Sequence, residues 1–239
     1  MSSTTSHQTK IEKHQPKVSV IVVAYNQERF IGRCLRSLLH QTIPHNNYEV
    51  IVVDDGSTDK TSYALGLFCD PTDSVIRVIT NKVNMGLPAS LNKGIRAARA
   101  PYIVRVDSDD FVNSNFINFL YFYLENNTNV DAVACDYLLL NDVEQLLEQC
   151  DCQEKPIACG IMFHKQQLFE IGLYDEKFKY QEEREMRIRF EKKYKIHRLE
   201  LPLYRYRRHD RNITNNHKEM EKYNKSLILK HGKLEIDIK

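Results

Sequence analysis

The sequence predicts an α/β fold: a single domain with a mostly parallel sheet, helices on both faces, and a mixed C-terminal half. Two observations support this prediction. The segments VSVIVVAY (18–25) and YEVIVVDD (48–55) are rich in β-branched residues, without polar alternation, which is typical of parallel strands buried on both faces. Helical segments follow them with short connections, and that alternation produces parallel sheets covered by helices on both sides.

Strands and helices alternate regularly through the first half of the chain. The helix expected at 27–41 places Phe30, Leu35 and Leu38 on one face. Ser57 or Thr58 is expected to cap the helix that follows the second strand. The other elements expected in this half are strands at 75–80 and 102–106 and helices at 89–98 and 114–125.

The second half has weaker patterns, and the chain ends in a polar tail. We expect residues 1–16 to be disordered, 17–211 to form the domain, and 212–239 to form a helical tail. The elements expected after residue 126 are strands at 131–140 and 158–165, a polar loop at 141–156, helices at 165–171, 181–194 and 215–234, and one or two strands over 197–209.

Composition excludes several classes of protein. Among 239 residues, Lys and Arg number 34 and Asp and Glu number 32, so the net charge of +2 does not suit a globally basic nucleic-acid-binding protein. No apolar run approaches the roughly 20 residues that span a bilayer. Six cysteines in a chain of this length favour a reduced, cytosolic compartment. A zinc site at Cys150, Cys152, Cys159 and His164 matches none of the usual ligand spacings.

Polar residues follow the predicted strands, where sheets of this kind bind ligands. The sequence lacks GxGxxG after its first strand, and it contains neither GxxxxGK[ST] nor GxSxG. These absences argue against a dinucleotide-binding oxidoreductase, a P-loop enzyme and a serine hydrolase. The residues that remain at the strand ends are carboxylates and amides, namely Asn26, Asp54, Asp55, Asn81, Asn84, Asp107, Asp109 and Asp110.

Three acidic pairs are candidates for chemistry. Asp107 and Asp109, two residues apart in extended chain, can reach one Mg²⁺ or Mn²⁺; the alternative is an acidic turn before a helix. Asp54 or Asp55 can accept hydrogen bonds from a base or a ribose, or simply form a turn. A carboxylate of the pair at 182–183 can act as a general base, although acids are favoured in any first helical turn.

A basic segment runs from 184 to 211. Arg205, Arg207, Arg208 and His209 lie together near a strand end, where they can neutralise a diphosphate. A solvated helix face and contact with an anionic membrane surface are the other uses open to this segment.

Six segments together resemble glycosyltransferase family 2, whose members are inverting enzymes with the GT-A fold. The resemblance covers residues 17–211, and DDGSTD followed by DSDD is its most specific part. It implies a nucleotide-binding half at 17–110 and an acceptor-binding half at 111–211. The matching segments are VSVIVVAYNQERFIGRCLRSLLHQT, EVIVVDDGSTDKT, NMGLPASLNKGIRAA, YIVRVDSDD, GIMFHKQQLFEIGLYDEKF and YQEEREMRIRF.

The resemblance implies a role for each matching residue. Asp54 would contact the base, Asp107 the ribose or a metal-bound phosphate, and Glu183 would be the catalytic base, with Glu182 on the acceptor side. Mn²⁺ or Mg²⁺ would be held by Asp107, Asp109 and His209. The nucleotide-sugar would also meet Tyr25, Asn26, Glu28, Asn84, Arg208 and His209.

Two positions depart from the family pattern. Glu183 replaces an aspartate, and Leu91 replaces an arginine that helps to bind the nucleotide in many members. The resemblance implies metal-dependent transfer of the hexosyltransferase type from a nucleotide-sugar to a saccharide or lipid-linked acceptor. A UDP-sugar is the donor that the resemblance favours. Such a reaction would serve polysaccharide or glycolipid synthesis in the cytoplasm or at the inner membrane face.

Alternatives to a glycosyltransferase remain at this stage. A non-catalytic relative would bind a nucleotide or a partner without turnover. A sugar nucleotidyltransferase is disfavoured because AYNQERF lacks the glycine-rich loop of such enzymes. The segments 141–156 and 172–183 are expected to shape the acceptor side. The tail helix can pack on the domain, form a homodimer contact or lie on a membrane as a peripheral element.

Overall fold

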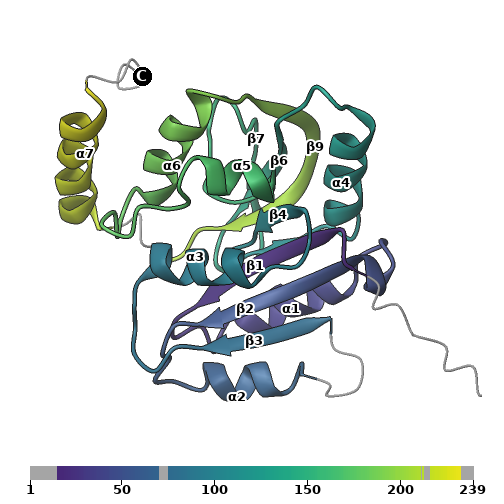
Figure 1. Ribbon diagram of the computed structural model, residues 1–239. Helices are drawn as coiled ribbons and strands as arrows, with labels where there is room; N and C mark the ends of the chain where they lie inside the picture. The colour runs from purple at the N-terminus through teal and green to yellow at the C-terminus, as the bar shows by residue number, and fades with distance from the viewer. Residues whose placement is uncertain (1–14, 70–74, 211, 213–215, 233–239) are drawn as a thin grey trace, which may run out of the picture.

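The computed structural model describes residues 15–69, 75–210, 212 and 216–232, and it contains one large sheet (Figure 1). The expected disorder at 1–16 falls almost entirely outside these residues. The neighbouring strands follow the order β3-β2-β1-β4-β8-β6-β9-β5, with β7 paired to β6. The strands are β1 (Val18–Ala24), β2 (Tyr48–Asp54), β3 (Ile76–Thr80), β4 (Tyr102–Arg105), β5 (Phe111–Val112), β6 (Ala132–Leu140), β7 (Leu146–Cys150), β8 (Ile161–His164) and β9 (Ile196–Arg207).

Helices cover both faces of the sheet, as the sequence predicts. Successive β1 side chains point to opposite faces, so Val20 and Val22 join one apolar cluster with α1 and α4, while Ile21 joins another with α3, α5 and α6. The helices are α1 (Ile31–Leu39), the 3-10 turn η1 (His45–Asn47), α2 (Thr61–Gly66), α3 (Leu87–Ala97), α4 (Phe116–Asn126), α5 (Lys165–Glu170), α6 (Glu182–Glu191) and α7 (His217–His231).

The two halves of the sheet differ in strand direction. The pairs β3–β2, β2–β1 and β1–β4 are parallel, which confirms the predicted parallel half. Strand β8 runs antiparallel to both β4 and β6, β6–β9 is parallel, and β9–β5 is antiparallel. The mixed C-terminal half is therefore confirmed, and β8 joins it to the parallel half.

Two local predictions are wrong, and one short strand was not predicted. The expected loop at 141–156 contains strand β7, whose exposed Leu146 and Leu147 are adjacent and give no alternating pattern. Strand β5 has only two residues and gives no signal. Helix α2 begins after Lys60 without a side-chain cap, because the Ser57 hydroxyl accepts a hydrogen bond from the Asn26 backbone instead.

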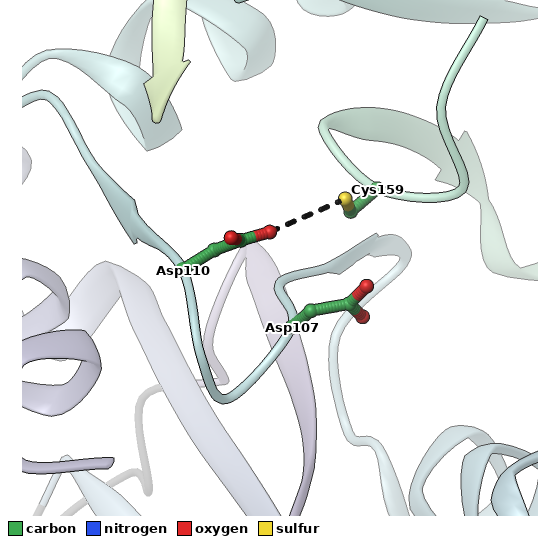
Figure 2. Close-up of side chains that lie close together, drawn as sticks. All are labelled: Asp107, Asp110 and Cys159. Atoms are coloured by element: carbon green, nitrogen blue, oxygen red, sulfur yellow. Dashed lines mark hydrogen bonds between the residues drawn. The ribbon is translucent and has the colours of Figure 1, made fainter. Parts of the chain in front are cut away.

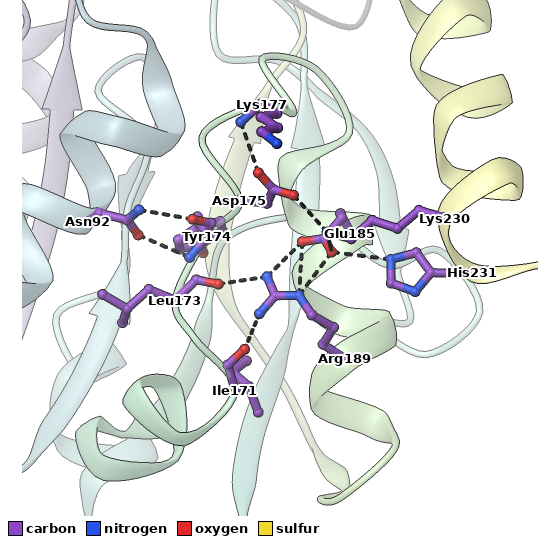
Figure 3. Close-up of polar contacts among 10 residues, drawn as sticks. All are labelled: Asn92, Ile171, Leu173, Tyr174, Asp175, Lys177, Glu185, Arg189, Lys230 and His231. Carbon is purple, nitrogen blue, oxygen red and sulfur yellow. Dashed lines mark hydrogen bonds and ion pairs between the residues drawn. The ribbon is translucent and has the colours of Figure 1, made fainter.

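The tail helix α7 packs on the domain rather than standing apart from it. Its Leu227 is buried with Phe178 and Ile188. Near the C-terminal end of α7, the fully buried Glu185 of α6 accepts hydrogen bonds from Arg189, Lys230 and His231 (Figure 3). Within the described part of the chain, no helix has the length and apolar character needed to cross a membrane.

The contacts of Glu185 predict how acid affects stability. Burial raises the pKa of this carboxyl, but hydrogen bonds from Arg189 and Lys230 outweigh burial and hold the pKa below its usual value. A group with a lowered folded pKa stabilises the protein above its unfolded pKa of about 4.3, and this contribution is lost as the pH falls through the folded value.

Replacing Glu185 is therefore expected to weaken the fold near neutral pH and to flatten its acid sensitivity. Glu185→Gln should lower the unfolding free energy at pH 7 by about 1.5–3 kcal/mol, because hydrogen bonds to a charged group are lost. Urea titrations at several pH values measure both effects. The matched control is Glu221→Gln, whose side chain is 71% exposed. Equal acid sensitivity of Glu185→Gln and the wild type would contradict the assignment.

Candidate active site

A cavity of about 1570 Å³ opens at the carboxyl ends of β1, β2 and β4, where the sequence predicts a site. It continues past the N-terminus of α6 and along that helix. Asp54 and Arg208 are not among its lining residues. The predicted site residues that line it are Tyr25, Asn26, Glu28, Asn84, Asp107, Asp109, Glu182, Glu183 and His209.

The two carboxylates after β2 have different surroundings. Asp54 is buried and turned into its own loop, where it accepts hydrogen bonds from the Ser57 backbone and the Ser62 hydroxyl. Asp55 lines the cavity and accepts from the backbone of Met85 and Gly86. Of the two carboxylates, only Asp55 lines the cavity, and Asp54 holds the loop in place.

The loop after β1 is tied to the loop after β2. Asn26 has a φ of 54° and its side-chain oxygen accepts hydrogen bonds from the Thr58 and Asp59 backbone. The Glu28 carboxylate accepts from the Lys60 backbone at 2.9 Å. These contacts close one end of the cavity and leave Tyr25 44% exposed beside them.

Arg105 lies at the end of β4 and joins two acidic residues that the sequence predicts to act on different substrates. Its Nε lies 2.6 Å from Asp107, and its Nη1 lies 3.0 Å from Glu182 at the start of α6. Burial alone would lower the pKa of Arg105, but the charges of Asp107 and Glu182 outweigh burial and raise it. The guanidinium thus stays charged and fixes the start of α6 against the acidic segment 107–110.

Asp110 anchors the acidic segment from below. It accepts hydrogen bonds from the Tyr204 hydroxyl and the Arg207 backbone of β9, at 2.8 and 2.7 Å. Burial raises the pKa of Asp110, and the nearby charges of Asp109 and Asp107 raise it further. Asp110 is a link between the acidic segment and β9, and it is turned away from the cavity.

Two groups of metal-ligand type converge among the described residues. Asp107, Asp110 and Cys159 form one group (Figure 2), and Asp136, Asp151 and Cys152 form the other. Burial raises the pKa of the Cys159 thiol, which disfavours the thiolate form that binds metals. Both oxygens of Asp110 already accept hydrogen bonds from protein donors. Neither group matches the zinc alternative, which required Cys150, Cys152, Cys159 and His164 together.

Asp109 and His209 form a further candidate pair of ligands for a divalent cation. The His209 Nε2 lies 2.9 Å from the Asp109 carboxylate, and both side chains line the cavity. The Phe30 ring stacks on the imidazole, with the ring centres 4.8 Å apart. Carboxylate and imidazole together suit Mn²⁺, and a hard cation completes its coordination with water or substrate phosphates.

Glu183 lies in the first turn of α6, facing the same cavity. Its carboxylate accepts a hydrogen bond from Arg187 at 2.7 Å, one turn further along. Arg187 also donates to the Ile157 carbonyl. The position of Glu183 is thus fixed by its own helix and by the loop before β8.

The arginines predicted to neutralise a diphosphate do not point their guanidinium groups into a shared anion site. Arg207 donates to the Asp109 and Asp142 carbonyls, Arg205 to the Pro202 carbonyl, and Arg208 is exposed. Leu91, at the position of the family arginine, is buried in the core with Ile21. Positive charge beside Asp107 comes from Arg105, which the sequence analysis did not single out. Its signal is a charged residue inside the apolar strand YIVRV, two positions before Asp107.

Comparison with known proteins identifies the family. The sequence model described as Glycosyl transferase family 2 matches residues 19–198. The chain belongs to glycosyltransferase family 2. Family 2 relatives include an uncharacterized glycosyltransferase of Haemophilus influenzae, 40% identical over 119 residues, and the poly(ribitol-phosphate) beta-glucosyltransferase of Bacillus spizizenii, 39% identical over 116 residues. The matches cover 50% and 48% of this chain but only 36% and 18% of those relatives.

Solved structures confirm the GT-A fold. The S. aureus TarS fragment 1–349 in complex with UDP-GlcNAc has a TM-score of 0.73 at 19% identity, covering 89% of this chain and 66% of that one. The mannosyltransferase PcManGT of Pyrobaculum calidifontis, in complex with GDP-Man and Mn²⁺, has a TM-score of 0.70 at 18% identity. That match covers 90% of this family 2 chain and 64% of PcManGT.

The burial of Arg105 predicts a large effect on stability. Arg105→Met leaves Glu182 buried without its cation, which should cost about 3–5 kcal/mol of unfolding free energy. Arg105→Lys should cost less, because a lysine keeps the charge but cannot bind both carboxylates through one planar fork. Chemical denaturation measures these differences.

The matched control is Arg29→Met. Arg29 pairs with Asp142, and its side chain is 62% exposed, so the loss should be at most about 1 kcal/mol. If Arg105→Met proved no more destabilising than Arg29→Met, the buried link between β4 and α6 would not contribute to stability.

Proposed function

We propose that this chain is an inverting glycosyltransferase that moves a sugar from a nucleotide-sugar donor to an acceptor hydroxyl. One observation carries the proposal: Asp55, the Asp109–His209 pair and Glu183 line one continuous cavity. The complexes of TarS with UDP-GlcNAc and of PcManGT with GDP-Man support a nucleotide-sugar donor. A UDP-sugar is the first donor to test.

The proposed reaction is a single displacement. The acceptor oxygen forms a bond to the anomeric carbon while the bond to the nucleoside diphosphate breaks. Glu183 accepts the proton of the acceptor hydroxyl, and the diphosphate leaves with the bonding electron pair. Fixing the base within its own helix fits this role, because general-base catalysis depends first on position.

The donor end is assigned from the contacts of each side chain. Asp55 lines the cavity and would accept a further hydrogen bond from the base, with Tyr25 beside it. Asp107, held by Arg105, would face the ribose. Asp109 and His209 would hold Mn²⁺ or Mg²⁺, and such an ion supplies positive charge that stabilises a departing diphosphate.

Acceptor and location remain predictions from the sequence. They comprise a saccharide or lipid-linked acceptor, a cytosolic location, and peripheral contact with the inner membrane face. The alternative is a non-catalytic relative that binds a nucleotide, and experiments must distinguish it from an active glycosyltransferase. It would bind a nucleotide without releasing sugar from any donor.

Metal-dependent nucleotide binding tests the donor site. UDP, GDP, CDP and dTDP are added separately, each with Mn²⁺ and with chelator, and thermal unfolding is followed. A nucleotide at about 100 times its dissociation constant should stabilise the fold by roughly 2.7 kcal/mol, with Mn²⁺ only. Asp109→Asn should abolish the shift. Asp131 lies just before β6 and does not line the cavity, so Asp131→Asn should keep the Mn²⁺-dependent shift. A shift that survives chelation or Asp109→Asn would contradict the metal assignment.

The base assignment is tested by substitution of Glu183. Glu183→Gln should keep Mn²⁺-dependent nucleotide binding but lose transfer by roughly 10²–10⁴-fold, since a general base contributes about that much. Transfer is measured as nucleoside diphosphate released in the presence of acceptor. Glu221→Gln, on the exposed face of α7, is the matched control and should behave as the wild type. Near-normal transfer by Glu183→Gln would remove Glu183 from the mechanism.

A further inference from the structure

The cavity is larger than one donor requires. Pockets for a small ligand commonly occupy about 300–1,000 Å³. This cavity measures about 1570 Å³ and extends beyond Glu183 along one face of α6, where Arg184, Arg187 and Glu191 line it. We call this part of the cavity the α6 groove; its lining includes Tyr180, Glu183, Arg184, Arg187, Glu191 and Met220. It adjoins Glu183, the proposed base.

One wall of the α6 groove comes from outside the segment that matches the family. That match ends at residue 198, whereas Met220 of α7 lines the cavity. Helix α7 also contacts the chain just before α6: Gln181 donates to the Met220 sulfur at 3.8 Å, and the rings of Tyr180 and Tyr223 lie 5.6 Å apart. This wall therefore includes a residue beyond the segment that the family model matches.

Helix α7 is held rigidly enough to act as a wall. Near its end, Lys230 and His231 both bind the fully buried Glu185, at 2.7 and 3.1 Å (Figure 3). Midway along the helix, the Arg184 guanidinium donates to Asn224 at 3.2 Å. These contacts fix the middle and the end of α7 to α6, while Gln181 contacts Met220 near its start.

The chemistry of the groove suits a neutral sugar. Over residues 179–191 the cavity lining carries three positive and three negative side chains, which gives an anionic ligand no net attraction; they are Lys179, Arg184, Arg187, Glu182, Glu183 and Glu191. The planar carboxylate and guanidinium groups among them can bind paired hydroxyls at the edge of a sugar ring. Tyr180 and Met220 offer apolar surface to its C–H face, and a tyrosine ring combines both kinds of contact.

We propose that the α6 groove binds an uncharged saccharide as the acceptor, and that Met220 and Tyr180 determine which saccharide fits. The inference rests on the proposed glycosyltransferase function, because Glu183 is the base that the acceptor must reach. Of these two residues, Tyr180 lies within the segment that the family model matches, and Met220 of α7 lies beyond it.

Binding is tested with methyl glycosides of glucose, galactose, mannose and N-acetylglucosamine, each beside its 6-phosphate. Saturation-transfer NMR on the full chain measures the binding of each compound. One series contains Mg²⁺ and the nucleoside diphosphate that stabilises the protein in thermal unfolding, and a second series contains no nucleotide. We expect at least one neutral glycoside to bind. Its 6-phosphate should bind no more tightly.

Met220→Trp places a large ring in the groove and should weaken glycoside binding at least about tenfold, or about 1.4 kcal/mol. Leu229→Trp is the matched control, because Leu229 lies on the same helix and is 87% exposed. It should bind glycosides as the wild type does. Nucleotide-induced stabilisation, measured for every variant, shows that each is folded. Tyr180→Leu is the second variant and should also weaken glycoside binding, should Met220→Trp fail to fold.

The outcomes separate the two proposals. Absence of glycoside binding by the wild type, or equal binding by the folded groove variants and the wild type, would overturn the acceptor groove while leaving the nucleotide result standing. Tighter, salt-sensitive binding of a 6-phosphate would overturn the neutral class. Absence of any nucleotide shift would instead overturn the proposed function, whatever the glycosides show.

Discussion

The buried guanidinium of Arg105 is the contact on which the site's geometry depends. It lies at the end of β4 and binds both Asp107 and Glu182. Arg105 and Glu182 are 77 residues apart in the sequence. The cation offsets part of the cost of burying Glu182, whose pKa burial still raises, and removing it would leave that carboxyl uncompensated. The parallel half and the helix carrying Glu183 are therefore held in one fixed relation.

A second long-range link completes the site. Asp110 accepts hydrogen bonds from Tyr204 and the Arg207 backbone, and this pairing brings the end of β9 back to the acidic segment. His209 follows directly and meets Asp109, a residue 100 positions earlier. Residues with no local relation in the sequence thus become neighbours because one buried carboxylate ties two strand ends together.

Local patterns predicted the parallel half of the fold well, because each element there carries its own hydrophobic signature. They could not distinguish Asp54 from Asp55, since adjacent residues at a strand end point opposite ways and only the loop decides which one faces the cavity. Strand β7 was missed because Leu146 and Leu147 are both exposed. The roles of Arg105 and Arg207 depend on partners that only the tertiary structure supplies.

The burial of Leu91 limits what this position can contribute. Its side chain is only 1% exposed and lies among apolar neighbours from β1 and β2, so an arginine introduced there would have to be desolvated. Such a substitution would therefore damage the core before it could serve a ligand, and a cation for this cavity has to come from another position.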